Sequence, residues 1–292
     1  MSHDTTHAGI RDPLFAVVGA TGQQGGATAR ALLDAGAGVR ALVRDPGSTG
    51  AQAVERRGAQ LVRAENDDPA SLRAAFTGVD GVFAMTTFAT ERGTEGEVEH
   101  GKAIADAALE AGVPNVVYGS VGGAERHTGI PHFESKRRVE EHMESVGLAV
   151  TFVRPTFFMD NFLRVSAPQA EEGTLVLRMP FPGGVPLQMI ASEDVGAVAA
   201  ATLMDPDRVP GGSVEIGGDE LTGEQIAAVH GEHAGLPARY EALPLDVLAG
   251  DPDLAAMFAW FAQAPSYRAD FAATRSLAPA VRDLRTWLAA AD

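Results

Sequence analysis

The stretch VVGATGQQGG, residues 17–26, places three glycines at intervals of three positions. It follows the apolar run LFAVV (14–18), which predicts a buried strand, and precedes ATARALLDAG (27–36), which has helical spacing and ends at a glycine. A glycine-rich loop between a strand and a helix either binds a phosphate at the helix N-terminus or only turns the chain tightly. The strand, loop and helix context favours a nucleotide phosphate site.

Beyond this loop, short apolar runs alternate with helical segments. Strands are expected at 38–44, 59–65, 81–87, 115–121 and 148–155, with a helix at 51–57 between the first two. The helix after 81–87 is expected to be capped by Thr94, with Glu97 completing a capping box, and to stop at Gly112. The alternation predicts an α/β fold with a doubly wound parallel sheet, the Rossmann arrangement.

The rest of the chain is expected to form a smaller C-terminal substrate lobe. We assign residues 13–158 to a nucleotide-binding domain and 159–292 to the lobe, with about 187–217 returning to the sheet. PLQMI (186–190) looks like a strand, SEDVGAVAAATLM (192–204) like a helix, and Thr222 like the cap of another helix. A cluster of aromatic residues and one methionine either walls an apolar pocket or forms the core of the lobe; it comprises Tyr240, Met257, Phe258, Trp260, Phe261, Tyr267, Phe271 and Trp287.

Composition narrows the classes of function. The chain has 292 residues, 45% of them hydrophobic, and no cysteine, which excludes disulfides and thiolate metal sites. A formal net charge of -16 argues against a nucleic-acid partner, because phosphate contacts need a basic surface. The first residues lack the pattern of a signal peptide and no apolar run has membrane-spanning length, so we expect a cytoplasmic protein without a membrane partner.

Arg44 bears on the choice of nucleotide. It stands at the end of the second expected strand, in ALVRDP, where cofactors without a 2′-phosphate usually meet an acidic residue. A guanidinium pairs well with a phosphate dianion, so Arg44 favours NADP(H) over NAD. The alternative is a solvated arginine paired with the neighbouring Asp45.

Several stretches together resemble the NmrA-like family of atypical short-chain dehydrogenases/reductases. They are VVGATGQQGG, ALVRDP, VVYGSVGG, HFESKRRVEEHMESVGLAVTFVRPTFFMDNF and MIASEDVG. The resemblance runs from Phe15 to about Gly218 and weakens thereafter. The glycine motif followed by Gln23 and Gln24 is fairly specific to this family, whereas VRDP is not.

This resemblance implies an NADP(H)-binding protein with a defined set of cofactor contacts. The residues lining the pyrophosphate would be Gly19, Thr21, Gly22, Gln24 and Gly25. The other implied contacts are Arg44 with the 2′-phosphate, Asn66 with the adenine, Thr86 and Thr87 beside the passing cofactor, and Pro155 and Phe157 at the nicotinamide.

The Tyr-x-x-x-Lys pair typical of short-chain reductases is altered. His132 and Lys136 stand at that spacing, and the tyrosine is absent. Lys136 shares the apolar stripe of its helix with Val139 and Met143, which suggests that it reaches the cofactor ribose over the strand ends. The alternative is an ion pair with Glu140, one turn further on.

His132 and Ser120 complete the catalytic candidates. The imidazole of His132 is suited to donating a proton near neutral pH, but a helix N-terminus disfavours its charged form, so it is otherwise a positioning or packing residue. Ser120 ends the fifth expected strand and either binds a substrate carbonyl or is a turn residue. The remaining histidines lack metal-site spacing, and no metal is expected.

Two functions fit these residues. One is an NADPH-dependent reductase that passes a hydride to a quinone, enone or carbonyl, where water can protonate the resulting oxyanion. The alternative is a non-catalytic NADP(H)-binding redox sensor that acts through a protein partner, helped by a mobile loop at 88–96. The substrate would be small and apolar or aromatic, such as a quinone, and the chain a monomer or homodimer.

Overall fold

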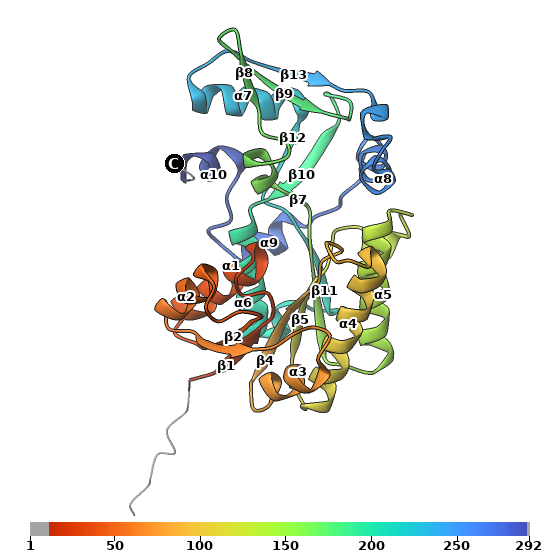
Figure 1. Ribbon diagram of the computed structural model, residues 1–292. Coiled ribbons are helices and arrows are strands. Elements are labelled where there is room, and N and C mark those ends of the chain that lie inside the picture. Colours follow the sequence, from red (N-terminus) through yellow and green to blue (C-terminus); the bar gives the residue numbers. More distant parts are fainter. Residues whose placement is uncertain (1–11, 291–292) are drawn as a thin grey trace, which may run out of the picture.

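A seven-stranded parallel sheet forms the centre of the computed structural model, which describes residues 12–290 (Figure 1). Its order is β11-β6-β5-β4-β1-β2-β3. The strands are β1 Leu14–Val17, β2 Gly38–Val43, β3 Gln60–Arg63, β4 Gly81–Met85, β5 Val116–Gly119, β6 Val150–Pro155 and β11 Ser213–Ile216. Strands β2 and β3 are added on one side of β1, whereas β4, β5 and β6 are added on the other. The order of the strands therefore reverses between β1 and β4, which is the switch point of a Rossmann fold. The predicted fold class is confirmed.

Helices cover both faces of this sheet, which explains why its strands are apolar runs without alternation. One face carries α1 Gln23–Asp34, α2 Thr49–Arg56, α6 Ser192–Met204 and the short α9 Phe271–Leu277. The other carries α3 Pro69–Phe76, α4 Gly93–Glu110 and α5 Pro131–Ser145. Each face has its own apolar core, and the sheet separates the two. No helix in the described part of the chain is both long and apolar enough to cross a membrane.

The lobe lies beyond the carboxyl ends of the sheet strands (Figure 1). It contains two three-stranded sheets, with orders β12-β10-β7 and β13-β9-β8. Its strands are β7 Phe157–Phe158, β8 Gln169–Glu171, β9 Thr174–Met179, β10 Pro186–Ile190, β12 Asp219–Thr222 and β13 Ala238–Ala242. Its helices are α7 Gly223–Ala234, α8 Pro252–Phe261 and α10 Leu284–Ala290. Four short 3-10 helices complete the structure: η1 Ala124–Arg126, η2 Met159–Leu163, η3 Pro206–Arg208 and η4 Leu245–Leu248.

The aromatic cluster of the C-terminal segment supplies much of the lobe's core. Phe258, Phe261, Tyr267 and Trp287 are buried in one apolar cluster with residues of η2 and β10. The ring of Phe261 contacts those of Phe258, Trp260 and Tyr267. These rings therefore pack against one another, as expected if the cluster forms the core of the lobe.

The chain crosses between sheet and lobe several times. After β6 it enters the lobe through β7, and β10 pairs there with β7 and β12. It then returns, because α6 packs along α1 and β11 pairs with β6. The segment at 187–217 thus divides: β10 lies in a lobe sheet, whereas α6 and β11 belong to the Rossmann layers.

One predicted helix start is wrong. Helix α4 begins at Gly93 after Arg92, and no side chain caps it, so Thr94 lies inside the first turn. The carboxylate of Glu97 is fully buried and bonded elsewhere, which leaves it unavailable for a capping box. The predicted cap at Thr222 is confirmed, because Thr222 and Gln225 form a reciprocal capping box at the start of α7.

Candidate functional site

Strand register brings the candidate residues together at one edge of the sheet. Met85 of β4 pairs with Gly119 of β5, so the next residues, Thr86 and Ser120, lie side by side just beyond the strands. Both side chains are buried. The carboxyl ends of parallel strands at a switch point are where this class of sheet binds ligands.

The glycine loop closes tightly between β1 and α1. Gly19 has a φ of +68°, which a side chain would strain, and Gly22 donates its N–H to the Gly19 carbonyl. A Cβ atom at Gly25 would lie 2.3 Å from the Gly19 carbonyl oxygen, so only glycine allows this approach of helix to loop. Gly22 is the N-cap of α1 and offers no side chain, which leaves the first N–H groups of the helix facing outward for an anion.

Lys136 sits at the centre of the strand-end site. Its ammonium nitrogen lies 2.6 Å from the Thr86 carbonyl oxygen and 3.0 Å from Glu97 Oε1. Longer contacts reach Thr86 Oγ1 at 3.2 Å and the Gly119 carbonyl at 3.5 Å. Lys136 is therefore buried with its charge balanced, at the carboxyl ends of β4 and β5. The alternative pair with Glu140 does not form, because Glu140 bonds to Arg154 and Arg137.

A buried hydrogen-bond network holds Lys136 in place. Glu97 accepts from the Thr86 hydroxyl at 3.1 Å and from the Ser135 hydroxyl at 2.5 Å. The Tyr118 hydroxyl lies 2.8 Å from Thr86 Oγ1. Burial, together with the negative charge of Glu97, raises the pKa of Tyr118 well above its usual value. Tyr118 therefore stays protonated and serves the network as a donor.

Two buried polar atoms beside this network have no hydrogen-bond partner among the described residues. They are Ser120 Oγ and Gln24 Oε1. A methyl group at Gly119 would lie 2.9 Å from Gln24 Oε1, so the glutamine reaches from α1 across to β5. Buried polar groups normally find partners, and unpaired ones cost free energy. An amide oxygen accepts a hydrogen bond and a hydroxyl can donate or accept one, so these two atoms fit the ribose hydroxyls of a dinucleotide.

The residues expected at the adenosine end lie along the neighbouring strands. Arg44 directly follows β2, is exposed and makes no hydrogen bond or ion pair within residues 12–290. Its alternative partner Asp45 accepts instead from the backbone N–H of Gly47. Asn66 is partly buried after β3, and Thr87 is exposed after β4.

The residues expected at the nicotinamide end lie where β6 passes into the lobe. Pro155 ends β6 and accepts a hydrogen bond from the Gly122 N–H at its carbonyl. Phe157 belongs to β7, and its ring packs against Phe162 and Phe261 in the lobe's core. Phe157 is buried, so it contributes to the base of the junction between sheet and lobe.

His132 is placed one helical turn before Lys136 at the start of α5. Its Nδ1 lies 2.5 Å from Asp253 Oδ1 of α8, a residue that sequence reasoning did not connect with it. The imidazole ring also contacts the rings of Phe88 and Phe133.

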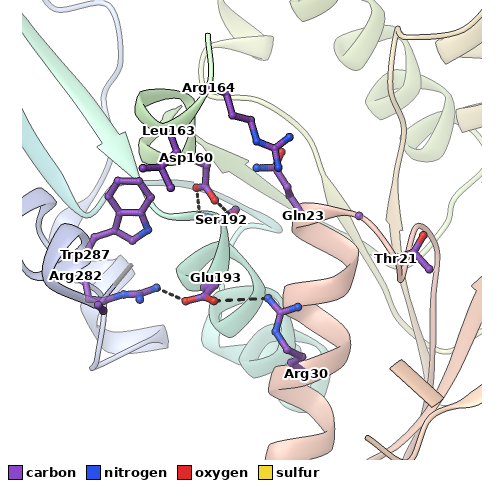
Figure 2. A pocket seen from close by; sticks show the side chains of 12 residues that line it. Thr21, Gln23, Arg30, Asp160, Leu163, Arg164, Ser192, Glu193, Arg282 and Trp287 are labelled. Atoms are coloured by element: carbon purple, nitrogen blue, oxygen red, sulfur yellow. Dashed lines mark hydrogen bonds and ion pairs between the residues drawn. The ribbon is translucent and has the colours of Figure 1, made fainter. Parts of the chain in front are cut away.

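A hollow of about 400 Å³ opens beside the glycine loop (Figure 2). It is lined from the Rossmann side by Thr21, Gly22, Gln23, Arg30, Ser192 and Glu193, and from the lobe by Asp160, Leu163, Arg164, Arg282, Trp287 and Ala290. Glu193 is paired with Arg30 and Arg282, and Asp160 caps α6 by accepting from Ser192. Arg164 has no ion pair within 12–290 and extends toward Gln23 (Figure 2).

Sequence reasoning missed Glu97, Tyr118, Ser135 and Asp253 as parts of the site. A signal existed for Glu97, because it lies on the same face of α4 as the buried Gly101, Ile104 and Ala108. A carboxylate on a buried face needs a cation. Within 12–290, no group of three or more His, Asp or Glu side chains is arranged to hold a metal ion.

The fold and the glycine-loop site together define a dinucleotide-binding Rossmann protein. The sequence model of the NmrA-like family matches residues 12–287. The chain therefore belongs to the NmrA-like family, which binds NAD(P).

Proteins similar to this chain in sequence or in fold include enzymes and a regulator. An NAD(P)H azoreductase from Xenophilus azovorans is 31% identical over 233 residues, covering 80% of this chain and 78% of the relative. The structure of NmrA, a negative transcriptional regulator, in complex with NADP superposes with a TM-score of 0.81 at 23% identity, covering 95% and 94% of the two chains. An NADPH-dependent quinone oxidoreductase from Escherichia coli gives 0.77 at 23% identity, covering 95% and 99%.

Proposed function

We propose that this protein is an NADPH-dependent reductase that passes a hydride to a quinone, enone or carbonyl compound. The observation that carries the proposal is the arrangement at the strand ends. The Lys136 ammonium is fixed there by Glu97, next to the buried and unpartnered Ser120 hydroxyl. A fixed cation and a free hydroxyl donor suit a site where negative charge develops on an oxygen.

We assign the cofactor contacts residue by residue. Gly19, Thr21, Gly22, Gln24 and Gly25 bind the pyrophosphate. The further assignments are Arg44 to the 2′-phosphate, Asn66 to the adenine, Thr86 and Thr87 to the passing cofactor, Lys136 to the ribose, and Pro155 and Phe157 to the nicotinamide end. The bound nicotinamide would supply the hydride. For Lys136 to bind ribose, it needs to exchange a partner, and its longest contact, to the Gly119 carbonyl at 3.5 Å, is the weakest one.

The chain's two parts would then have separate tasks. In this proposal residues 13–158 hold the nucleotide, and 159–292 cover it and shape the substrate side, apart from the returning part of 187–217. The reductase relatives support the activity, and the azoreductase and quinone oxidoreductase names indicate small, flat, electron-accepting substrates.

NADPH consumption against a panel of quinones, enones and aldehydes tests the activity. Ser120→Ala removes a hydroxyl that has no partner, so the fold should be retained while turnover falls about 10-fold or more. The turnover of Lys136→Ala should be lower still. Lys102→Ala is the matched control, because Lys102 is exposed on α4. Wild-type protein that binds NADPH without turning over any substrate would contradict the proposal and favour a redox sensor acting through a protein partner.

A further inference from the structure

The N-terminal ends of α5 and α8 meet through a single side-chain pair. His132 is the second residue of α5 and Asp253 is the second residue of α8. His132 Nδ1 lies 2.5 Å from Asp253 Oδ1, and the His132 backbone nitrogen lies 3.5 Å from the same oxygen. The two side chains are 14% and 19% exposed, so the pair is largely shielded from water. Figure 1 shows α8 of the lobe beside the upper end of α5.

This pair fixes which imidazole nitrogen carries a proton. An ionised carboxylate only accepts hydrogen bonds, so Nδ1 must be the donor and hold a hydrogen. The second nitrogen, Nε2, lies on the far edge of the ring from Asp253 and has no partner within residues 12–290. Phe88 and Phe133 hold the ring from its sides, with centroid distances of 5.1 and 4.8 Å. The imidazole is thus oriented, and its other nitrogen is left available.

The same turn of α5 is tied to the strand-end site. The Ser135 hydroxyl lies 2.5 Å from the Glu97 carboxylate and 3.0 Å from the His132 carbonyl oxygen, so its one hydrogen is shared between these two acceptors and favours the closer carboxylate. Glu97 in turn holds Lys136. Phe88, against which His132 packs, lies two residues beyond Thr86 at the end of β4. His132 therefore stands at the rim of the site that Lys136 occupies.

We propose that His132 donates, from Nε2, the proton that the reduced substrate needs, and that Asp253 is a positioning residue that holds the imidazole for this task. The inference rests on the reductase function proposed above. It narrows the substrate class to compounds whose reduction leaves an oxyanion, such as quinones and other carbonyl acceptors. A carboxylate bonded to one imidazole nitrogen fixes the orientation of the ring and so the direction in which the other nitrogen points.

The step balances as follows. A hydride, with its two electrons, converts a quinone into the hydroquinone monoanion. The Nε2–H bond of the His132 imidazolium breaks and a new O–H bond forms on that oxygen. The imidazole, now neutral and still bonded to Asp253 through Nδ1–H, takes up a proton from water. The overall change consumes one NADPH and one proton for each hydroquinone formed.

Two substitutions at His132 separate proton donation from a structural contact. In His132→Asn the amide nitrogen can still bond to Asp253, but the atom at the Nε2 position is absent. In His132→Gln the amide reaches toward the Nε2 position but cannot supply a proton of comparable acidity. Both variants should lower kcat for quinones by about 100-fold or more while KM for NADPH changes little. Thermal unfolding of His132→Asn should stay close to that of wild type.

Asp253→Asn tests the positioning role against a matched control. Asp251→Asn removes a charge from the same turn and keeps an N-cap acceptor for the Leu254 N–H, so its turnover should stay within about twofold of wild type. Asp253→Asn should lower kcat by about 10-fold. It should also change the size of the solvent deuterium isotope effect on kcat relative to wild type. A loss of the same size in both variants would contradict a specific role for Asp253.

Nitrogen NMR of 15N-histidine-labelled protein gives a readout that needs no turnover. The His132 signals are identified by their absence from the His132→Asn spectrum. The expected neutral tautomer in wild type has its proton on Nδ1, and Asp253→Asn should shift the population toward Nε2–H. A wild-type Nε2–H tautomer, or full quinone turnover by His132→Asn, would overturn the proposal. If wild type reduces no substrate, the reductase function fails, whereas the tautomer measurement still decides whether Asp253 positions His132.

Discussion

Lys136 is one of only two lysines in a chain with 23 lysine and arginine residues. A lysine rather than an arginine suits this position, because the ammonium is a compact charge with three donors that can point in different directions. These donors reach the Thr86 carbonyl, Glu97 and the Gly119 carbonyl, which lie around one buried point. A planar guanidinium could not satisfy the same three acceptors there.

Breaking the ion pair between Glu97 and Lys136 should be costly. In Glu97→Gln the buried Lys136 ammonium loses its counter-charge, which is expected to lower the free energy of unfolding by about 3–5 kcal/mol. Glu99→Gln is the control on the same helix, because Glu99 forms an exposed pair with Arg92 that contributes less than about 1 kcal/mol. Urea denaturation of both variants checks the difference, and similar small losses would show that the buried pair is not a major source of stability.

Arg44 should decide between the two nicotinamide cofactors. It is exposed and unpaired within the described residues, so its removal breaks no internal contact. We expect Arg44→Ala to weaken NADPH binding by about 10- to 150-fold, the range for a hydrogen bond to a charged group, and to leave NADH binding nearly unchanged. Fluorescence titration measures both. Arg56→Ala, at an exposed arginine of α2, is the control, and equal losses for NADPH and NADH in Arg44→Ala would refute the assignment.

Individual side chains were the least predictable part of the site. The position of Lys136 at the strand ends followed from its place on an apolar helix stripe, and the structure places it there. The partners of Lys136 and His132 did not follow, because Glu97 and Asp253 come from helices whose contacts with α5 depend on tertiary packing. Sequence spacing reports neighbours on one helix and carries no information about such distant pairs.

The elements themselves were largely predictable. All six Rossmann strands expected between residues 14 and 155 are present, because buried parallel strands are apolar runs with clear boundaries. The two capping-box patterns show where such prediction ends. Thr222 with Gln225 forms the box, whereas Thr94 with Glu97 does not, because the Glu97 carboxylate is drawn into the interior by Lys136. A capping-box pattern therefore fails to form when one of its residues pairs with a buried charge instead.

The crossing of α1 and α6 depends on one glycine. A Cβ atom at Gly196 would lie 2.4 Å from the Ala27 carbonyl carbon and 2.6 Å from the Thr28 nitrogen, both backbone atoms of α1. Gly196→Ala should force the helices apart, lower stability by about 1–3 kcal/mol and weaken NADPH binding, because α1 carries the glycine loop. Gly184→Ala, where a Cβ atom meets nothing within 4 Å, is the control for thermal unfolding and cofactor titration. Unchanged NADPH binding by Gly196→Ala would show that the packing of α6 on α1 does not affect the glycine loop.

Across the molecule, stability is expected to depend on pH through a buried histidine of the lobe. His230 of α7 packs against Phe162 of η2, and burial, with a smaller contribution from His233, lowers the pKa of His230 to about 4. The unfolded chain therefore binds this proton first as the pH falls. The free energy of unfolding should be unaffected by His230 above about pH 6.5 and should decrease toward pH 4, by up to about 3 kcal/mol.

Thermal unfolding between pH 7 and 4 measures this loss. In His230→Leu the part of the decline that belongs to His230 should disappear, so the stability of the variant relative to wild type should rise by up to about 3 kcal/mol as the pH falls from 7 to 4. His233→Gln, at an exposed neighbouring site, should change the slope only slightly. A wild-type slope that persists in His230→Leu would assign the acid sensitivity to other groups.

The interleaved path of the chain also has a consequence for synthesis. Ser213 of β11 pairs with Phe152 of β6, and the lobe strand β10 pairs with Phe157 on one side and with the later Glu220 on the other. On the ribosome, a nascent chain that has emerged only through α6 therefore presents an open edge of β6 and an incomplete lobe sheet. Open strand edges are templates for pairing with other chains. We expect such intermediates to need shielding by a chaperone until the residues of β11 and β12 have emerged.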